Sequence, residues 1–291
     1  MITFRQYLAE GGSATEEYGT ERANKNDIEA VLRVVSKALQ IPVDTLAADL
    51  LGSTRVTLAG KRKDSGDIDI AMSLEDSDVK TIDAKMLALA NGQGAYNPGT
   101  KVGSYAVPVN GKKIQVDLMY VKNKDWARFI YHSEIGDGSK YSGAARNLML
   151  RAALAVMIEP DKDFVHADET GREVARARKG ITMDQGLRRI FRLARVNAKT
   201  GKHNKSMTAV EPEELAAFMK SIGKDVKFSM DRDATDNPKE VVEFIFGPGT
   251  DPKAVGTAEG VLALIKKHPK AEEIMKIAKS ESEKLNFPIP S

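Results

Sequence analysis

The dipeptide Asn110-Gly111 constrains the fold of this chain more than any other feature of the sequence. It stands between two runs rich in apolar residues, 104–109 and 112–121. Asn-Gly accepts the positive φ angles that a tight hairpin turn needs, so the arrangement predicts two antiparallel strands joined by a two-residue turn. This part of the chain is therefore expected to form a β-sheet.

Other segments before residue 125 supply a further strand and two helices. Residues 67–72 alternate polar and apolar side chains, as a half-buried strand does. Residues 26–39 carry apolar side chains at helical spacing, with Asp27 as the expected N-cap. A second helix is expected over 78–90. Together these elements predict a mixed sheet with helices, preceded by a loose polar tail.

Beyond residue 125 the pattern is mostly helical, with a long helix expected over 144–157. We expect a hairpin near 168–171 and then a basic helix that starts after Thr182 and ends near Asn197. The polar segment 198–206 indicates a linker. Four short helices are expected after it, over 211–222, 238–246, 258–267 and 270–284.

Composition excludes several kinds of site. The chain has no cysteine, so disulfides, thiolate nucleophiles and cysteine-bound zinc or iron–sulfur clusters are impossible. Its four histidines are too scattered to predict a histidine metal site. Any metal chemistry must therefore use carboxylates. No run approaches the ~18 apolar residues of a membrane span, and the first ten residues lack a signal-peptide core, so we expect a cytosolic protein.

Charge is distributed unevenly along the chain. From Arg172 to Lys205 there are eleven Lys or Arg and two acids, which gives +9 and leaves −6 for the rest of a chain of net charge +3. Such a run is often a solvated helix face. Here one face of the expected helix can pack while the other presents arginines, so the stretch could also meet the phosphates of a nucleic acid.

Three acids are the main catalytic candidates. Asp67 and Asp69 are two apart in the expected strand, so both carboxylates project from one face. Asp117 has the same apolar–acid–apolar setting in the hairpin's second strand. If these strands are neighbours, three carboxylates converge and their repulsion requires cations. Such oxygens select Mg²⁺ or Mn²⁺, and two such ions support in-line phosphoryl transfer. Taken alone, Asp-x-Asp also occurs on ordinary surface strands.

Gly52-Ser53 is a candidate phosphate site. It follows two leucines and precedes four basic residues, Arg55, Lys61, Arg62 and Lys63. A Gly-Ser turn that leads into a helix lets backbone N–H groups and a small hydroxyl approach phosphate oxygens, and Arg or Lys balances their charge.

These segments together resemble the signature of the DNA polymerase beta type of nucleotidyltransferases, the X family of DNA polymerases. The matching segments are Leu51-Gly52-Ser53, Ser65-Gly66-Asp67-Ile68-Asp69-Ile70 and Val116-Asp117-Leu118. Further on, Tyr131-His132, Gly138-Ser139 and Asn147 to Arg151 resemble the family's Tyr-Phe-x-Gly-Ser and Asn-x-x-(Leu/Met)-Arg elements.

The resemblance spans roughly residues 45–197, about half of the chain. The sequence departs from the family pattern in three places. Four additional residues separate Gly-Ser from Asp67, residues 134–137 are inserted, and His132 replaces the expected aromatic residue. The choice between ribose and deoxyribose therefore stays open.

The resemblance implies an α/β (α+β) fold built on a nucleotidyltransferase palm with a mixed sheet. The palm would span 25–125, after a flexible tail over 1–24. An α/β subdomain facing the nucleotide and template would span 126–197, and a helical C-terminal extension would span 198–291.

It also implies residue roles. Asp67 and Asp69 would bind both of two Mg²⁺ ions, with Mn²⁺ as a possible substitute, and Asp117 would bind the catalytic ion. The triphosphate would contact Gly52, Ser53, Arg55, Arg62 and Gly66. The sugar would contact Tyr131, and the nascent base pair would contact Asn147 and Arg151.

The implied reaction is transfer of a nucleoside monophosphate from a (d)NTP to a nucleic-acid 3′-hydroxyl. DNA is favoured over RNA as the partner of the stretch from Arg172 to Lys205. Two alternatives stay open: a template-independent enzyme that modifies RNA, tRNA or a protein hydroxyl, and a nucleic-acid binder without turnover. The first eight residues resemble the starts of tailed-bacteriophage proteins, which would place the chain in a host cytoplasm.

Overall fold

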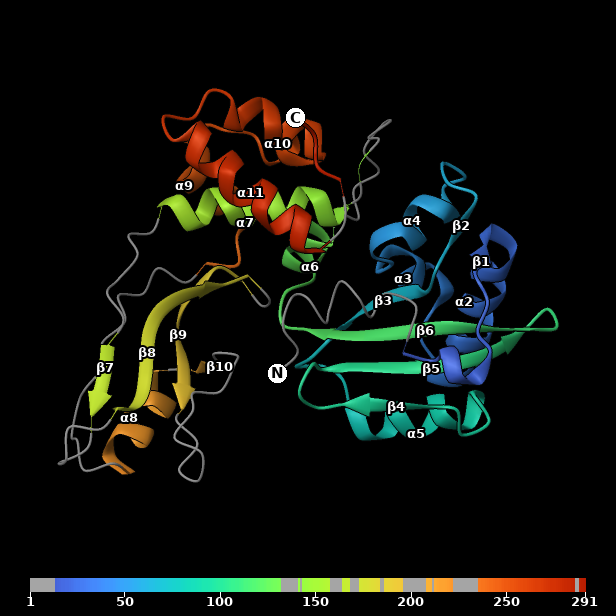
Figure 1. The fold of residues 1–291 in the computed structure, drawn as a ribbon. Helices are drawn as coiled ribbons and strands as arrows, with labels where there is room; N and C mark the ends of the chain where they lie inside the picture. The colour runs from blue at the N-terminus through green and yellow to red at the C-terminus, as the bar shows by residue number, and fades with distance from the viewer. Residues whose placement is uncertain are drawn as a thin grey trace.

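The computed structural model describes residues 14–131, 141, 143–157, 164–167, 173–183, 186–195, 208–210, 212–221, 235–285 and 288–291. Figure 1 shows these residues as a mixed sheet with its helices, a group of helices that includes the C-terminal ones, and a second sheet with one helix. The chain is thus a mixture of α and β structure, as expected.

The mixed sheet contains four strands, in the order β3-β6-β5-β4. Their bounds are β3 Ile68–Ser73, β4 Gly94–Asn97, β5 Val102–Val109 and β6 Lys112–Val121. Strand β3 runs parallel to β6, and the other two pairs are antiparallel. The predicted hairpin is confirmed, because β5 and β6 meet at Asn110 and Gly111, whose φ angles are 50° and 77°.

Helices cover one face of this sheet. The helices of this body are α2 Lys25–Leu39, α3 Val43–Ala48, α4 Gly52–Leu58 and α5 Val79–Leu89. Buried side chains of α2 and α5 pack with Ile70 of β3 and with Val116 and Leu118 of β6. Since side chains alternate along a strand, Asp69 and Asp117 lie on the opposite face.

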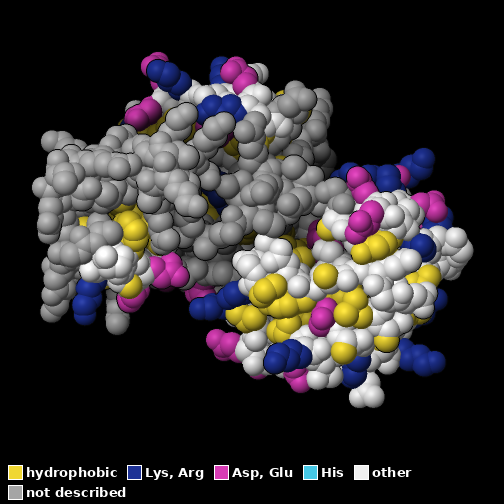
Figure 2. Space-filling view, turned by 60° about the horizontal axis from the view of Figure 1, so that its bottom comes forward, with side chains coloured by type: hydrophobic (Ala, Val, Ile, Leu, Met, Phe, Trp, Pro, Cys, Tyr) yellow, Lys and Arg dark blue, Asp and Glu magenta, His cyan; other side chains and the backbone are white. Residues whose placement is uncertain are grey.

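One side of the sheet body presents several kinds of side chain to solvent (Figure 2). Figure 2 turns the lower side of Figure 1 toward the viewer, where hydrophobic side chains form a broken band among polar ones and most charged side chains lie around it. Such a mixture is typical of a solvent-facing surface.

The structure corrects the expectation of a loose tail for residues 14–24. This segment contains the 3₁₀ turn η1 (Glu16–Tyr18) and strand β1 (Ala23–Asn24), which pairs with β2 (Asp64–Ser65). The Glu21 N–H donates to the Lys113 carbonyl at 2.8 Å. Because β3 pairs with β6 only from Val116 onward, the start of β6 offers backbone groups that this segment satisfies.

The helical body is built around α7 (Gly143–Met157). Its other elements are α6 Lys124–Ile130, α9 Pro238–Phe246, η2 Pro252–Val255, α10 Ala258–Ile265 and α11 Ala271–Leu285. Side chains from α6, α7, α9, α10 and α11 share one hydrophobic core. The last three predicted helices are confirmed, and they cover α7. The core therefore crosses the boundary expected at residue 197.

The second sheet has the antiparallel order β10-β9-β8-β7. Its strands are β7 Phe164–Ala167, β8 Glu173–Thr182, β9 Arg188–Arg195 and β10 Thr208–Val210, and α8 (Pro212–Ser221) packs on it. Antiparallel pairing of β7 with β8 confirms the hairpin predicted between them. Helix α8 likewise agrees with the helix predicted over 211–222.

The prediction of a basic helix after Thr182 is wrong, because residues 188–195 form strand β9. Phe191 and Leu193 are buried with a period of two, and β9 is paired on both sides. A short run of arginines and apolar residues fits both the 3.6-residue period of a helix and the two-residue period of a strand. Pairing with distant strands therefore decides which of the two forms. The linker expected over 198–206 lies outside the described residues.

Within the part of the chain that the structure describes, no helix has the length and apolarity required to cross a bilayer.

The N-cap of α2 also differs from the prediction. The helix begins at Lys25, with Asn24 as its N-cap. The Asn24 side chain accepts from the Asp27 N–H at 3.1 Å, and the Asp27 carboxylate accepts from the Asn24 N–H at 3.2 Å. Asp27 is thus the third helical residue of a capping box rather than the cap itself.

Replacing Asn24 by Ala should therefore lower the free energy of unfolding by about 1 kcal/mol, because a helix N–H loses its acceptor. The matched control is Asn26→Ala in the exposed first turn of α2, where we expect a change within about 0.5 kcal/mol. Urea denaturation measures both. Equal destabilisation by the two changes would contradict the capping assignment.

Candidate active site

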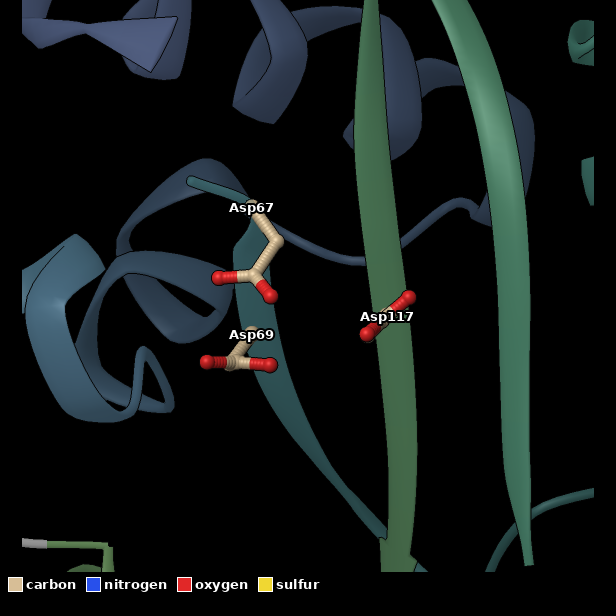
Figure 3. A group of neighbouring side chains, drawn as sticks. All are labelled: Asp67, Asp69 and Asp117. Carbon is tan, nitrogen blue, oxygen red and sulfur yellow. The ribbon is translucent and has the colours of Figure 1, made fainter. Parts of the chain in front are cut away.

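Three carboxylates meet on the face of the mixed sheet that lies opposite to α2 and α5. Asp67 immediately precedes β3, Asp69 lies within β3, and Asp117 is directly opposite Asp69 in β6. One oxygen from each carboxylate lies within 4.8 Å of the others. Figure 3 shows Asp67 and Asp69 one after the other along β3, with Asp117 beside them on β6. The structure thus brings together the three acids singled out in the sequence.

Burial makes it costly to ionise all three acids. Asp67 and Asp117 are 8% and 9% exposed. Burial, aided by the charges of Asp67 and Asp117, holds the pKa of Asp69 well above its ordinary value. Burial and then the charge of Asp67 raise the pKa of Asp117 to about 7. The cluster is therefore expected to ionise fully only when cations balance it.

The residues fit a hard divalent cation. Mg²⁺ takes oxygen ligands at 2.0–2.1 Å in octahedral geometry, which places its ligand oxygens about 3–4 Å apart. The carboxylate oxygens need only small movements from their present separations to meet this requirement. Asp67, Asp69 and Asp117 are therefore the residues that would hold such ions.

Two neutral side chains hold Asp117 in place. Gln115 donates from Nε2 to both oxygens of Asp117, at 3.1 and 3.0 Å, and is fully buried. Ser104 lies opposite Asp117 on β5 and also hydrogen-bonds its side chain. These hydrogen bonds act against the rise in the pKa of Asp117. Sequence reasoning missed both residues, although the i, i+2 spacing of Gln115 and Asp117 places them on one face.

Helix α4 is fixed against the acids by Thr54, which is fully buried. Its hydroxyl donates to the Asp67 carbonyl at 3.0 Å and accepts from the Asp69 N–H at 3.2 Å. A Cβ on Gly52 would lie 3.4 Å from an oxygen of Asp69, and the φ angle of Gly52 is +54°. Glycine at this position lets α4 begin beside the carboxylates.

The predicted phosphate residues lie next to this cluster. Ser53 is in the first turn of α4, and its hydroxyl is hydrogen-bonded to that of Ser65. Gly66 follows Ser65 and leads directly to Asp67. Gly66 is thus adjacent to Asp67 in the chain, Ser53 is hydrogen-bonded to Ser65 two residues before Asp67, and Gly52 lies close to Asp69.

Arg22 is a basic residue of this surface that the sequence analysis placed in the tail. Its Nε donates to Asp64 at 2.7 Å, and its Nη1 is 3.6 Å from the position that a Cβ on Gly66 would take. The hydrogen bond from Arg22 lowers the pKa of Asp64, and the charge of Arg62 contributes to the same effect. Arg62 is exposed in the turn after α4, and Arg55 is part of α4.

The residues predicted to contact the sugar and the base pair lie in or at the end of helices α6 and α7. Tyr131 ends α6, and its carbonyl oxygen is 3.8 Å from a Cβ built on Gly52. The Asn147 amide is held by the protein itself, since it donates to the Ile130 carbonyl and accepts from Arg146 at 2.8 Å. Arg151 is partly buried in α7.

Other predicted contacts fall outside the described residues. These are His132, Gly138, Ser139 and, within the basic stretch, residues 172, 184–185 and 196–205. Within that stretch, residues 173–182 and 188–195 form strands β8 and β9.

No protein-family model matches this chain, and a search of curated proteins finds no match either.

A pH titration of stability tests the state of the cluster. The pKa of Asp117 is higher in the folded protein than in the unfolded chain. Its ionisation therefore lowers the free energy of unfolding, an effect that is absent below about pH 4 and grows as the pH rises to about 7. Metal-free wild type should therefore lose stability relative to Asp117→Asn between pH 5 and 8. We expect a relative loss of about 2 kcal/mol, measured by urea denaturation in EDTA.

The control is Glu75→Gln, an acid-to-amide change at an exposed turn after β3. Its stability should follow the wild-type pH dependence. If the curves of wild type and Asp117→Asn run parallel from pH 5 to 8, the buried acid cluster described above is wrong.

Proposed function

We propose that this protein is a metal-dependent nucleotidyltransferase of the DNA polymerase beta type. It transfers a nucleoside monophosphate from a (d)NTP to a 3′-hydroxyl of nucleic acid and releases pyrophosphate. The observation that carries the proposal is the convergence of Asp67, Asp69 and Asp117 beside Gly52-Ser53. Three acids at one point, two of them buried, repel one another when they are ionised, and bound cations would relieve this repulsion.

The acids would hold two divalent ions on their own face of the sheet, opposite to α2 and α5. Asp67 and Asp69 would bind both ions, and Asp117 would bind the one nearer the attacking hydroxyl. When bound, a pair of Mg²⁺ ions supplies charge stabilisation for the attacking and leaving oxygens of an in-line displacement. The hydrogen bonds from Gln115 and Ser104 keep the Asp117 carboxylate directed at this position.

The triphosphate would lie along Gly52, Ser53 and Gly66. The absence of side chains at the two glycines allows close approach of an anion, and the Ser53 hydroxyl can donate to it. Arg22 supplies positive charge beside Gly66, and Arg62 adds to it from the exposed turn. Arg55 of α4 is the remaining basic candidate.

The acceptor is proposed to be nucleic acid because of the basic stretch from Arg172 to Lys205, with eleven basic and two acidic residues. The same three acids would also serve transfer to RNA or to a protein hydroxyl. Labelled dNTPs and NTPs offered with gapped DNA, single-stranded DNA, tRNA or cell extract distinguish these acceptors. If label appears only in tRNA or only in a protein, that molecule is the acceptor and DNA is not.

Asp117→Ala should nearly abolish turnover, with kcat reduced by about 10³-fold or more, because a ligand of the catalytic ion is lost. Primer extension measures the rate, and a cooperative thermal unfolding transition shows that the variant folds. Glu75→Gln, the exposed acid-to-amide control, should keep wild-type activity. Normal primer extension by Asp117→Ala would contradict the proposed role.

Arg22→Gln should raise KM for the triphosphate by about 10-fold, because a charge-assisted hydrogen bond to phosphate is lost. Arg33→Gln is the matched control, since Arg33 is exposed on α2 and pairs with Glu29. Asp64→Asn separates the two roles of Arg22, because it breaks the ion pair and leaves the guanidinium. An unchanged KM in Arg22→Gln would remove Arg22 from the triphosphate site.

A further inference from the structure

A chain of hydrogen bonds connects the N-terminal segment to the acid cluster. The backbone N–H and the hydroxyl of Thr15 donate to Oε1 of Gln115, at 3.3 and 2.8 Å. Gln115 Nε2 in turn donates to both oxygens of Asp117. Thr15 is 1% exposed and Gln115 is fully buried. The contacts between Thr15, Gln115 and Asp117 are therefore shielded from water.

Thr15 determines which end of the Gln115 amide faces Asp117. A backbone N–H can only donate, so the amide oxygen has to face Thr15 and the amide NH₂ group has to face the carboxylate. The flipped amide would place its oxygen against Asp117 and its N–H groups against the Thr15 N–H. Both contacts would be repulsive in a buried site.

We propose that Thr15 is a positioning residue for the metal centre and acts through Gln115 on Asp117. This inference rests on the proposed function, because it concerns how the same site is held. Groups behind a metal ligand orient that ligand and are often worth a large factor in metal affinity. Gln115 does this without charge, so its hydrogen bonds fix Asp117 and leave the negative charge available to a cation.

The segment that carries Thr15 has its own attachments to the sheet. The Lys113 ammonium group donates to the Tyr18 carbonyl at 3.1 Å, and the Glu21 N–H donates to the Lys113 carbonyl. Strand β1 then pairs with β2, with Ala23 opposite Ser65. Removing the Thr15 hydroxyl should therefore leave residues 18–24 docked, so a Thr15 variant reports on Gln115 rather than on loss of the segment.

The test compares four variants in the full chain. Thr15→Val removes the shorter of the two hydrogen bonds to Gln115 and keeps the shape and the backbone N–H, so it loosens the Gln115 amide without reversing it, while Thr15→Ser restores the donor. Gln115→Met removes the connecting amide. Thr20→Val is the matched control, because the Thr20 hydroxyl lies 3.3 Å from both the hydroxyl and the carbonyl oxygen of Thr15 and belongs to the same segment.

Mn²⁺ binding, followed by electron paramagnetic resonance, is the first readout. We expect affinity to fall by about 10-fold in Thr15→Val and by at least as much in Gln115→Met. Thr15→Ser and Thr20→Val should stay within about twofold of wild type. The second readout needs no metal: the side-chain amide signals of Gln115 should be protected from hydrogen exchange in wild type and lose protection in Thr15→Val.

The outcomes separate the two proposals. Wild-type chain that binds no Mn²⁺ overturns the proposed function, and with it the role of Thr15 at a metal centre. If wild type binds Mn²⁺ and folded Thr15→Val binds it equally well, the positioning role alone is overturned. Equal loss of affinity in Thr15→Val and Thr20→Val also overturns it, because the effect would then belong to the segment as a whole.

Discussion

The parallel pairing of β3 with β6 is the contact on which the rest of the structure depends. It places Asp69 opposite Asp117 and, one residue away on each strand, turns Ile70 and Leu118 toward α2 and α5. A shift by one residue would move Asp117 into the core and expose the apolar side chains of β6. Hydrophobic burial therefore sets the register, and the register assembles the acids.

The acid cluster is maintained at a cost to the folded state. Burial raises the pKa values of Asp69 and Asp117, so their charged forms destabilise the metal-free protein. The apolar face of the same sheet offsets this cost, because Ile28, Val31 and Leu32 of α2 are buried against it. Thr54, Ser104 and Gln115 provide hydrogen-bond partners for the polar groups at the acids.

Elements whose periodicity is long or whose turn chemistry is specific could be predicted from the sequence. The hairpin at Asn110-Gly111, α7 and the last three helices belong to this group. Asp67, Asp69 and Asp117 could also be identified, because each stands beside apolar residues of an expected strand and Gly52-Ser53 precedes them in the chain. Their meeting at one point requires the pairing of β3 with β6, which only the fold supplies.

The remaining features depend on contacts between residues far apart in the chain. Thr15 lies in a polar segment with no pattern of its own, and it is buried because Gln115 accepts its hydrogen bonds. Arg22 belongs to the surface beside Gly66 only because β1 pairs with β2. Residues 188–195 become a strand because β8 and β10 flank them. Local propensity contains none of this information.

The most direct test of the central claim is the anomalous scattering of crystals grown with Mn²⁺ and a non-hydrolysable nucleoside triphosphate. We expect two manganese peaks about 3.5–4 Å apart. Both peaks should contact Asp67 and Asp69, and one of them should contact Asp117. Bound nucleotide without manganese at these three acids, or manganese bound only elsewhere on the surface, would contradict the claim.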